Sequence, residues 1–129
     1  MFYQDDVLRK VETIFKRPLL LVCNTDPHDQ PGKHWIAMYV DGNSRGEYFD
    51  SLGEPPPTLF KNYLNRTCAS WITNSRQLQS AASRFCGQYC VFYYLFRCLD
   101  YSLIAIDSCF SNDTGLNGVF VHTIVCKLL

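Results

Sequence analysis

A cysteine at the start of a predicted apolar helix is a candidate nucleophile in this sequence. Cys86 heads the segment CGQYCVFYYLF, shortly after the polar run of residues 79–84. At the first turn of a helix, unpaired backbone N–H groups and the helix dipole favour a negative charge, which lowers a thiol pKa and supplies nucleophilic thiolate. Gly87 keeps side-chain bulk away from the sulfur, and we predict that it borders the substrate. The alternative for Cys86 is a buried structural thiol.

A histidine and an aspartate lie on the two arms of a predicted hairpin. Strands predicted over 34–40 and 47–51 flank the turn sequence DGNSRG. If the turn is centred near Gly42, His34 lies directly opposite Asp50, at a Cβ separation of about 4.5–5.5 Å. We expect Nδ1–H of the imidazole to donate to the carboxylate, which leaves Nε2 facing a nucleophile. The alternative is a surface ion pair that only supports the hairpin.

A glutamine seven residues before the cysteine completes the pattern. Gln79 lies on the loop that leads to the helix, where its amide could donate to a developing oxyanion. The backbone N–H of Cys86 would be the second donor. Gln77 is a rival for this role, and a solvated loop position is the alternative for either glutamine.

In this order and spacing, the motifs resemble those of a known family. They are HW at 34–35, YFDSLG at 48–53 and Q-x6-CGQYC from Gln79 onwards. They are similar to adenain, the adenovirus maturation protease, and to its relatives encoded by Polinton and Maverick mobile elements. More distantly, they resemble proteases that remove SUMO-like modifiers. The resemblance covers about residues 18–99.

The resemblance implies a role for each of five residues. Cys86 matches the nucleophile, and His34 matches the general base and acid. Asp50 matches the carboxylate that orients the histidine, and Gln79 matches the oxyanion-hole amide. Trp35 matches the aromatic residue that lines the substrate site. The implied activity is that of a cysteine endopeptidase, a thiol protease that cleaves protein substrates near glycine during maturation of a virus or virus-like element.

The resemblance also bears on cofactors. Cys68 lies eleven residues before Gln79, the spacing at which adenain carries the cysteine that forms a disulfide with its activating viral peptide. An activating peptide at Cys68 is therefore implied, with a buried structural thiol as the alternative. The sequence requires no other cofactor. Twelve basic and twelve acidic residues give formal neutrality, which argues against nucleic-acid partners and against DNA as a cofactor.

Composition favours one domain. A length of 129 residues, 47% of them hydrophobic, suits a single core, and we expect one adenain-like domain over 1–129 that is shorter than the adenovirus enzyme at both ends. We expect no signal peptide, because residues 1–18 carry seven charged side chains. We expect no membrane segment, because the apolar runs are too short to span a bilayer. Seven cysteines without regular spacing favour reduced thiols in the nucleus or cytoplasm, or in a virion.

The order of the predicted elements indicates an α+β fold. From the resemblance, this is a papain-like core in permuted order, with a small antiparallel sheet packed against helices. The predicted strands cover 19–24, 34–40, 47–51 and 68–73. The predicted helices cover 5–16, 59–64, about 86–99 and a stretch near 101–110, before a final apolar segment, 119–129.

The sequence leaves three other functions open, and it also raises the question of a metal site. Cys90 lies one helical turn after Cys86, but no second pair with zinc-like spacing accompanies them, so we expect no metal. Core or near-core positions are expected for four thiols: Cys90, Cys98, Cys109 and Cys126. The functional alternatives are an isopeptidase for ubiquitin-like modifiers, an acyltransferase that uses the same groups and a catalytically silent binding domain.

Overall fold

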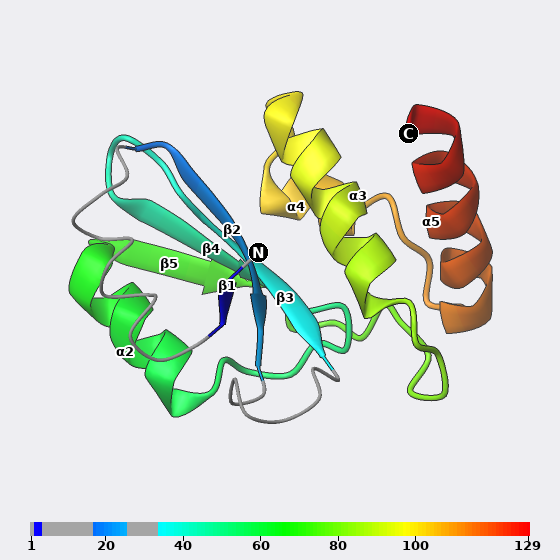
Figure 1. The fold of residues 1–129 in the computed structure, drawn as a ribbon, viewed down its shortest axis with the longest axis horizontal. Helices are drawn as coiled ribbons and strands as arrows, with labels where there is room; N and C mark the ends of the chain where they lie inside the picture. The colour runs from blue at the N-terminus through cyan, green and yellow to red at the C-terminus, as the bar shows by residue number, and fades with distance from the viewer. Residues whose placement is uncertain (1, 4–16, 26–33) are drawn as a thin grey trace.

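A central sheet organises the part of the chain that the computed structural model describes, residues 2–3, 17–25 and 34–129 (Figure 1). The predicted helix over 5–16 lies outside this part. Within it, the sheet has five strands in chain order. They are β1 Phe2–Tyr3, β2 Leu19–Asn24, β3 Trp35–Val40, β4 Arg45–Phe49 and β5 Ser70–Thr73.

The sheet is mixed, whereas the sequence predicts an antiparallel one. The two ladders of β3, with β2 and with β4, are antiparallel as expected. The outer ladders, β1 with β2 and β4 with β5, are parallel. Between β4 and β5 the chain passes through helix α2, Thr58–Thr67, and such a crossover lets the next strand run in the same direction.

Alternate residues of β3 face two separate hydrophobic layers. Ile36, Met38 and Val40 pack with α2, in a cluster that also contains Phe60. Ala37 lies in the second cluster, on the opposite face. Helices cover both faces, which explains why these strands read as nearly continuous apolar runs rather than as alternating ones.

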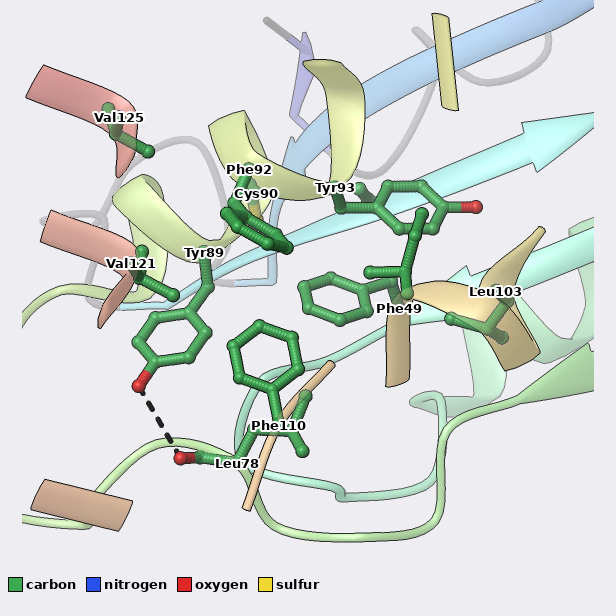
Figure 2. Close-up of a cluster of buried hydrophobic side chains, with 12 residues drawn as sticks. Phe49, Leu78, Tyr89, Cys90, Phe92, Tyr93, Leu103, Phe110, Val121 and Val125 are labelled. Atoms are coloured by element: carbon green, nitrogen blue, oxygen red, sulfur yellow. Dashed lines mark hydrogen bonds between the residues drawn. The ribbon is translucent and has the colours of Figure 1, made fainter. Parts of the chain in front are cut away.

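Three helices lie on the side of the second face (Figure 1). They are α3 Cys86–Cys98, α4 Leu103–Asp107 and α5 Thr114–Leu128. Helix α3 packs against β3, and α5 packs on α3, beyond it from the sheet. Figure 2 shows the aromatic cluster beneath them, in which Phe49 of β4 stacks on Tyr93 of α3 at 4.8 Å between ring centroids. Burial of each such side chain contributes roughly 1.5–3 kcal/mol. Among the described helices, none is long and apolar enough to cross a membrane.

The β3–β4 hairpin has a different register from the predicted one. Its ladder is centred on Asn43 rather than on Gly42. When that register is extended, Ile36 and not His34 lies opposite Asp50. His34 is therefore a diagonal neighbour of the aspartate, about 7–8 Å away by general strand geometry.

The side chain of Asp41 explains this register. Its Oδ1 accepts hydrogen bonds from the backbone N–H groups of Asn43 at 2.9 Å and Arg45 at 2.8 Å. Ser44 has a φ of +60°, in the left-handed region. Together these features close a three-residue turn, the type in which the last position is left-handed.

Candidate active site

The predicted nucleophile and base meet where the start of α3 contacts the start of β3. Helix α3 begins at Cys86, and β3 begins one residue after His34. The two side chains are hydrogen-bonded to each other. The backbone N–H groups of Trp35 and Gly87 also donate to the sulfur of Cys86. The residue types that the motifs single out are thus brought into contact, and we treat the contact as a candidate active site.

The surroundings of Cys86 favour its thiolate. The residue is only 5% exposed, and this burial by itself would raise the pKa of the thiol. The hydrogen bond with His34 and the backbone donors Trp35 and Gly87 act in the opposite direction, because each stabilises a negative sulfur. Their combined effect is larger, and the pKa of Cys86 is lowered.

The imidazole presents the opposite nitrogen from the predicted one. Nε2 of His34, and not Nδ1, lies 2.7 Å from Oδ1 of Asp50. This leaves Nδ1 as the ring nitrogen that faces Cys86. The hairpin register supplies the reason, since a diagonal carboxylate is farther from the histidine backbone and is reached by the distal ring nitrogen. Asp50 itself is buried, at 2% exposure.

Two negative partners keep the imidazole protonated. Burial by itself would lower the pKa of His34. Hydrogen bonds and charge interactions with Asp50 and Cys86 have the larger, opposite effect and raise this pKa to about 10. Because the pKa of His34 is higher in the folded chain than in the unfolded chain, its protonation stabilises the fold. This stabilisation is complete below the pKa of the unfolded chain's histidine and is lost as the pH rises through about 10. The lowered thiol pKa stabilises the fold above the unfolded value and loses its effect as the pH falls. The two shifts act in opposite directions and widen, from both sides, the pH range in which thiolate and imidazolium coexist.

Asp50 is held by groups that the sequence motifs do not reveal. The backbone N–H of Leu52 donates to its Oδ1 at 2.8 Å. The buried side chain of Asn74 brackets its backbone, because Oδ1 accepts from the Asp50 N–H at 2.9 Å and Nδ2 donates to the Asp50 carbonyl at 2.6 Å. Asn74 lies 24 residues away in the chain, and no local pattern marks it.

Gln79 lies at the predicted place, and its rival does not. Gln79 is 2% exposed and lines the same cleft as Cys86. Its Nε2 donates to the carbonyl of Ser83 at 3.0 Å. Gln77 is exposed and donates its own amide to the backbone carbonyl of Gln79 at 2.9 Å. This contact separates the two glutamines, since Gln77 supports the loop rather than lining the cleft.

The cleft beside the sulfur has a volume of about 1050 Å³. Trp35 and Gly87, the two predicted substrate-binding residues, both line it. A Cβ atom built on Gly87 would meet no atom within 4 Å, so the glycine leaves open space next to Cys86. An extended peptide could therefore approach the sulfur closely at this point.

The remaining cysteines do not all lie where the sequence predicts. Cys68 is 9% exposed, and its sulfur packs against Gly46 in the core below α2. This burial favours the structural alternative over a disulfide with an activating peptide. Cys90 is buried as expected, but the prediction of core or near-core positions is wrong for three exposed thiols: Cys98, Cys109 and Cys126. The structure describes all seven cysteines, and none of them forms a disulfide. The described residues contain no cluster of three or more metal ligands.

Comparison with known proteins shows sequence similarity to viral cysteine proteases. The cysteine protease of African swine fever virus is 34% identical over an alignment 111 positions long, which covers 70% of this chain and 39% of the viral protein. The protease of bovine adenovirus 7 is 33% identical over an alignment 87 positions long, which covers 56% of this chain and 43% of that enzyme. This chain is related to the adenain-like viral cysteine proteases. It spans about two fifths of the length of these relatives.

Solved structures extend the adenain-like relationship to the fold. A crystal structure of the African swine fever virus protease superimposes with a TM-score of 0.61 at 27% identity, covering 80% of this chain and 41% of that one. The predicted α+β papain-like fold is thereby confirmed. Relatives from other isolates of the same virus, at 33% identity, carry the name SUMO-1 cysteine protease. No protein-family model matches the chain.

Proposed function

We propose that this chain is the catalytic region of a cysteine endopeptidase. The observation that carries the proposal is the contact of a thiol of lowered pKa, Cys86, with an imidazole of raised pKa, His34, at the edge of an open cleft. Asp50 orients the imidazole through Nε2. The same arrangement of thiolate, imidazolium and carboxylate is what nucleophilic attack on a peptide carbonyl requires.

In the proposed reaction, the Cys86 thiolate adds to the carbonyl carbon of the substrate. The carbon–oxygen π pair moves onto oxygen, where the backbone N–H of Cys86 and the amide of Gln79 stabilise the negative charge. Each such donor contributes on the order of 3 kcal/mol to the transition state. The tetrahedral intermediate then collapses, the C–N bond breaks, and the leaving amine takes a proton from Nδ1 of His34.

The second half of the reaction restores the enzyme. Neutral His34 takes a proton from a water molecule, whose oxygen attacks the thioester carbon. The new tetrahedral intermediate breaks its C–S bond and releases a carboxylic acid product. Cys86 returns as thiolate and His34 as imidazolium, so protons and electron pairs balance over the cycle.

The substrate class follows from the cleft and from the relatives. We propose a protein substrate with glycine near the scissile bond, because the substrate backbone must pass closely beside Trp35 and Gly87. The biological setting is proposed to be maturation of the proteins of a virus or a virus-like mobile element, since the named relatives are viral proteases. An activating peptide remains a proposal, disfavoured at Cys68 by the burial of that thiol.

The test is cleavage of peptides that contain a Gly-Gly bond, read by mass spectrometry of the products. We expect the chain to cleave them, and the variants Cys86→Ala and His34→Ala to lose turnover by several orders of magnitude. Cys90→Ala is the matched control, because its thiol lies one turn further along α3 and away from the cleft. Cleavage that survives Cys86→Ala would refute the proposal.

An isopeptidase is the second candidate, because several viral relatives are named SUMO-1 cysteine proteases. The same assay separates the two candidates when a folded ubiquitin-like protein ending in Gly-Gly is fused to a reporter. Faster release from this fusion than from the matched linear peptide would favour the isopeptidase. Equal rates would favour the endopeptidase.

A further inference from the structure

Ser51 is a buried hydroxyl that the proposed reaction does not use directly. It follows Asp50 in the chain and is 0% exposed. Its Oγ donates to Oε1 of Gln79 at 2.5 Å. A hydroxyl can donate only one hydrogen bond, and a buried hydroxyl that commits it to a single oxygen fixes the orientation of that partner.

Two contacts select one orientation of the Gln79 amide. The amide could in principle turn by 180°, which would exchange its oxygen and its nitrogen. The carbonyl of Ser83 accepts from Nε2 at 3.0 Å, and after such a turn it would face Oε1, an acceptor against an acceptor. Ser51 supplies the hydrogen that Oε1 needs on the other side. The second hydrogen of Nε2 has no partner among the described residues, and Gln79 lines the cleft.

The backbone of Ser51 holds the other end of the same residue. Its carbonyl oxygen accepts hydrogen bonds from the backbone N–H groups of Leu78 and Gln79, both at 2.9 Å. Ser51 therefore contacts Gln79 at its main chain and at its amide. The neighbouring Asp50 contacts the imidazole of His34. Two adjacent residues after β4 thus hold the base and the amide donor.

We propose that Ser51 is a positioning residue that presents the Gln79 amide to the oxyanion. The inference rests on the proposed function. No bond to Ser51 forms or breaks during the reaction. As the thiolate adds to the carbonyl carbon, the displaced π pair creates negative charge on oxygen, and the free N–H of Gln79 is already directed toward it. Such preorganised donors act in the transition state rather than in substrate binding.

The first test compares turnover with alkylation in Ser51→Ala. We expect kcat to fall about tenfold or more while KM changes little, because an amide that can turn no longer presents its N–H reliably. Reaction of Cys86 with iodoacetamide should keep its wild-type rate. That displacement forms a C–S bond and expels iodide at a saturated carbon, so it creates no oxyanion. Loss of both reactions in equal measure would indicate a merely structural role and would overturn the proposal.

Ser102→Ala is the matched control. Ser102 also uses its Oγ in one local hydrogen bond, accepting from the N–H of Ala105 at 3.2 Å at the start of α4. It does not line the cleft. We expect its removal to leave kcat unchanged, which distinguishes the effect of Ser51 from general loss of a serine hydrogen bond.

A double-mutant cycle decides whether Ser51 acts through Gln79. In a Gln79→Ala background, Ser51→Ala should lower kcat no further. An undiminished fall in that background would overturn the proposal, as would wild-type kcat in the single variant.

If Ser51→Ala does not fold, Ser51→Cys retains the size but weakens the donor, and its kcat should lie below the wild-type value. An unchanged kcat in Ser51→Cys would overturn the proposal. Absence of cleavage by the wild-type chain would instead refute the proposed function.

Discussion

At the scale of single residues, the chemistry depends on a charge pair that burial alone would prevent. Desolvation disfavours both the thiolate of Cys86 and the imidazolium of His34. Their mutual contact, together with Asp50, reverses both effects. The reactive form of the site is therefore a consequence of three side chains acting together, and removal of one should change the titration of the others.

Asp50→Asn tests this coupling through pH. In turnover, the acid limb of the pH profile reports loss of the thiolate and the alkaline limb reports loss of the imidazolium. Asp50 raises the pKa of His34, so the variant should move the alkaline limb from about 10 to lower pH. A weaker imidazolium stabilises the thiolate less, so the acid limb should move to higher pH. The active window should narrow from both sides, and its maximum should fall.

The matched control for this profile is Asp100→Asn, at an exposed position after α3 where φ is +66° and asparagine is well tolerated. It should leave both limbs in place. Unchanged limbs in Asp50→Asn would show that the carboxylate does not set the titration of the pair.

The structure brings together the residues that the sequence selected, but in a geometry that the sequence did not predict. Four residues were selected by type and spacing, and the structure places Cys86, His34 and Asp50 in contact, with Gln79 in the same cleft. The predicted ring orientation of His34 was wrong, because it depends on the register of the β3–β4 hairpin, and that register differs from the predicted one. Asn74 and Ser51 were missed because their contacts are made across the fold.

At the scale of elements, a tight turn after β4 places Asp50 next to the loop that carries Gln79. Gly53 has a φ of +72°, and its N–H donates to the carbonyl of Asp50 at 2.8 Å. A Cβ atom at this position would lie 2.8 Å from backbone atoms of Arg76 and Gln77. The close approach brings the segment that leads to Gln79 against the end of β4, so the glycine sets the relative position of the two parts of the site.

Gly53→Ala should therefore damage stability and activity together. We expect a loss of about 1–3 kcal/mol in the free energy of unfolding, from backbone strain and from the collision with the neighbouring main chain. Urea denaturation measures the loss, and peptide cleavage should fall because the Gln79 loop is displaced. Gly42→Ala is the control, since a Cβ there meets nothing within 4 Å. Equal denaturation midpoints for the two variants would contradict this explanation.

The type of each element, helix or strand, was predicted more accurately than the direction of strand pairing and the residues at which helices begin. Helix α3 begins at Cys86 as expected, because its apolar pattern is continuous from there. The final apolar segment is part of α5, which begins at Thr114, where Asp113 caps the helix by accepting from the N–H of Leu116 at 3.0 Å. Direction within the sheet was harder to predict, because a parallel ladder depends on where the crossover helix packs.

At the scale of the whole molecule, a buried polar network joins the sheet to α3, the helix that begins at Cys86, and to the start of α4. Glu47 of β4 accepts from the hydroxyl of Tyr93 at 2.5 Å and from the N–H of Leu103 at 3.2 Å. It also forms an ion pair with Arg97 at 3.2 Å. The guanidinium of Arg97 lies over the ring of Tyr39, 3.9 Å from its centroid. One carboxylate thus contacts both α3 and the start of α4.

Glu47→Ala should be among the most destabilising changes. It leaves Arg97 largely buried without its negative partner, and breaking one side of such a pair costs about 3–5 kcal/mol. The free energy of unfolding in urea measures this. The double variant Glu47→Ala with Arg97→Met should regain part of the loss, because the unpaired charge is gone. Glu54→Ala, at an exposed position, should change stability by less than about 0.5 kcal/mol. A loss that small for Glu47→Ala would contradict a structural role for the network.

Limited alkylation shows whether Cys86 is an activated nucleophile. The chain is treated with substoichiometric iodoacetamide at neutral pH, and the modified thiols are located by peptide mass spectrometry. Cys86 is nearly buried, whereas Cys98, Cys109 and Cys126 are exposed. Thiolate activation predicts that Cys86 is modified first and that His34→Ala removes this preference. First labelling of the exposed cysteines, with Cys86 unmodified, would contradict the account.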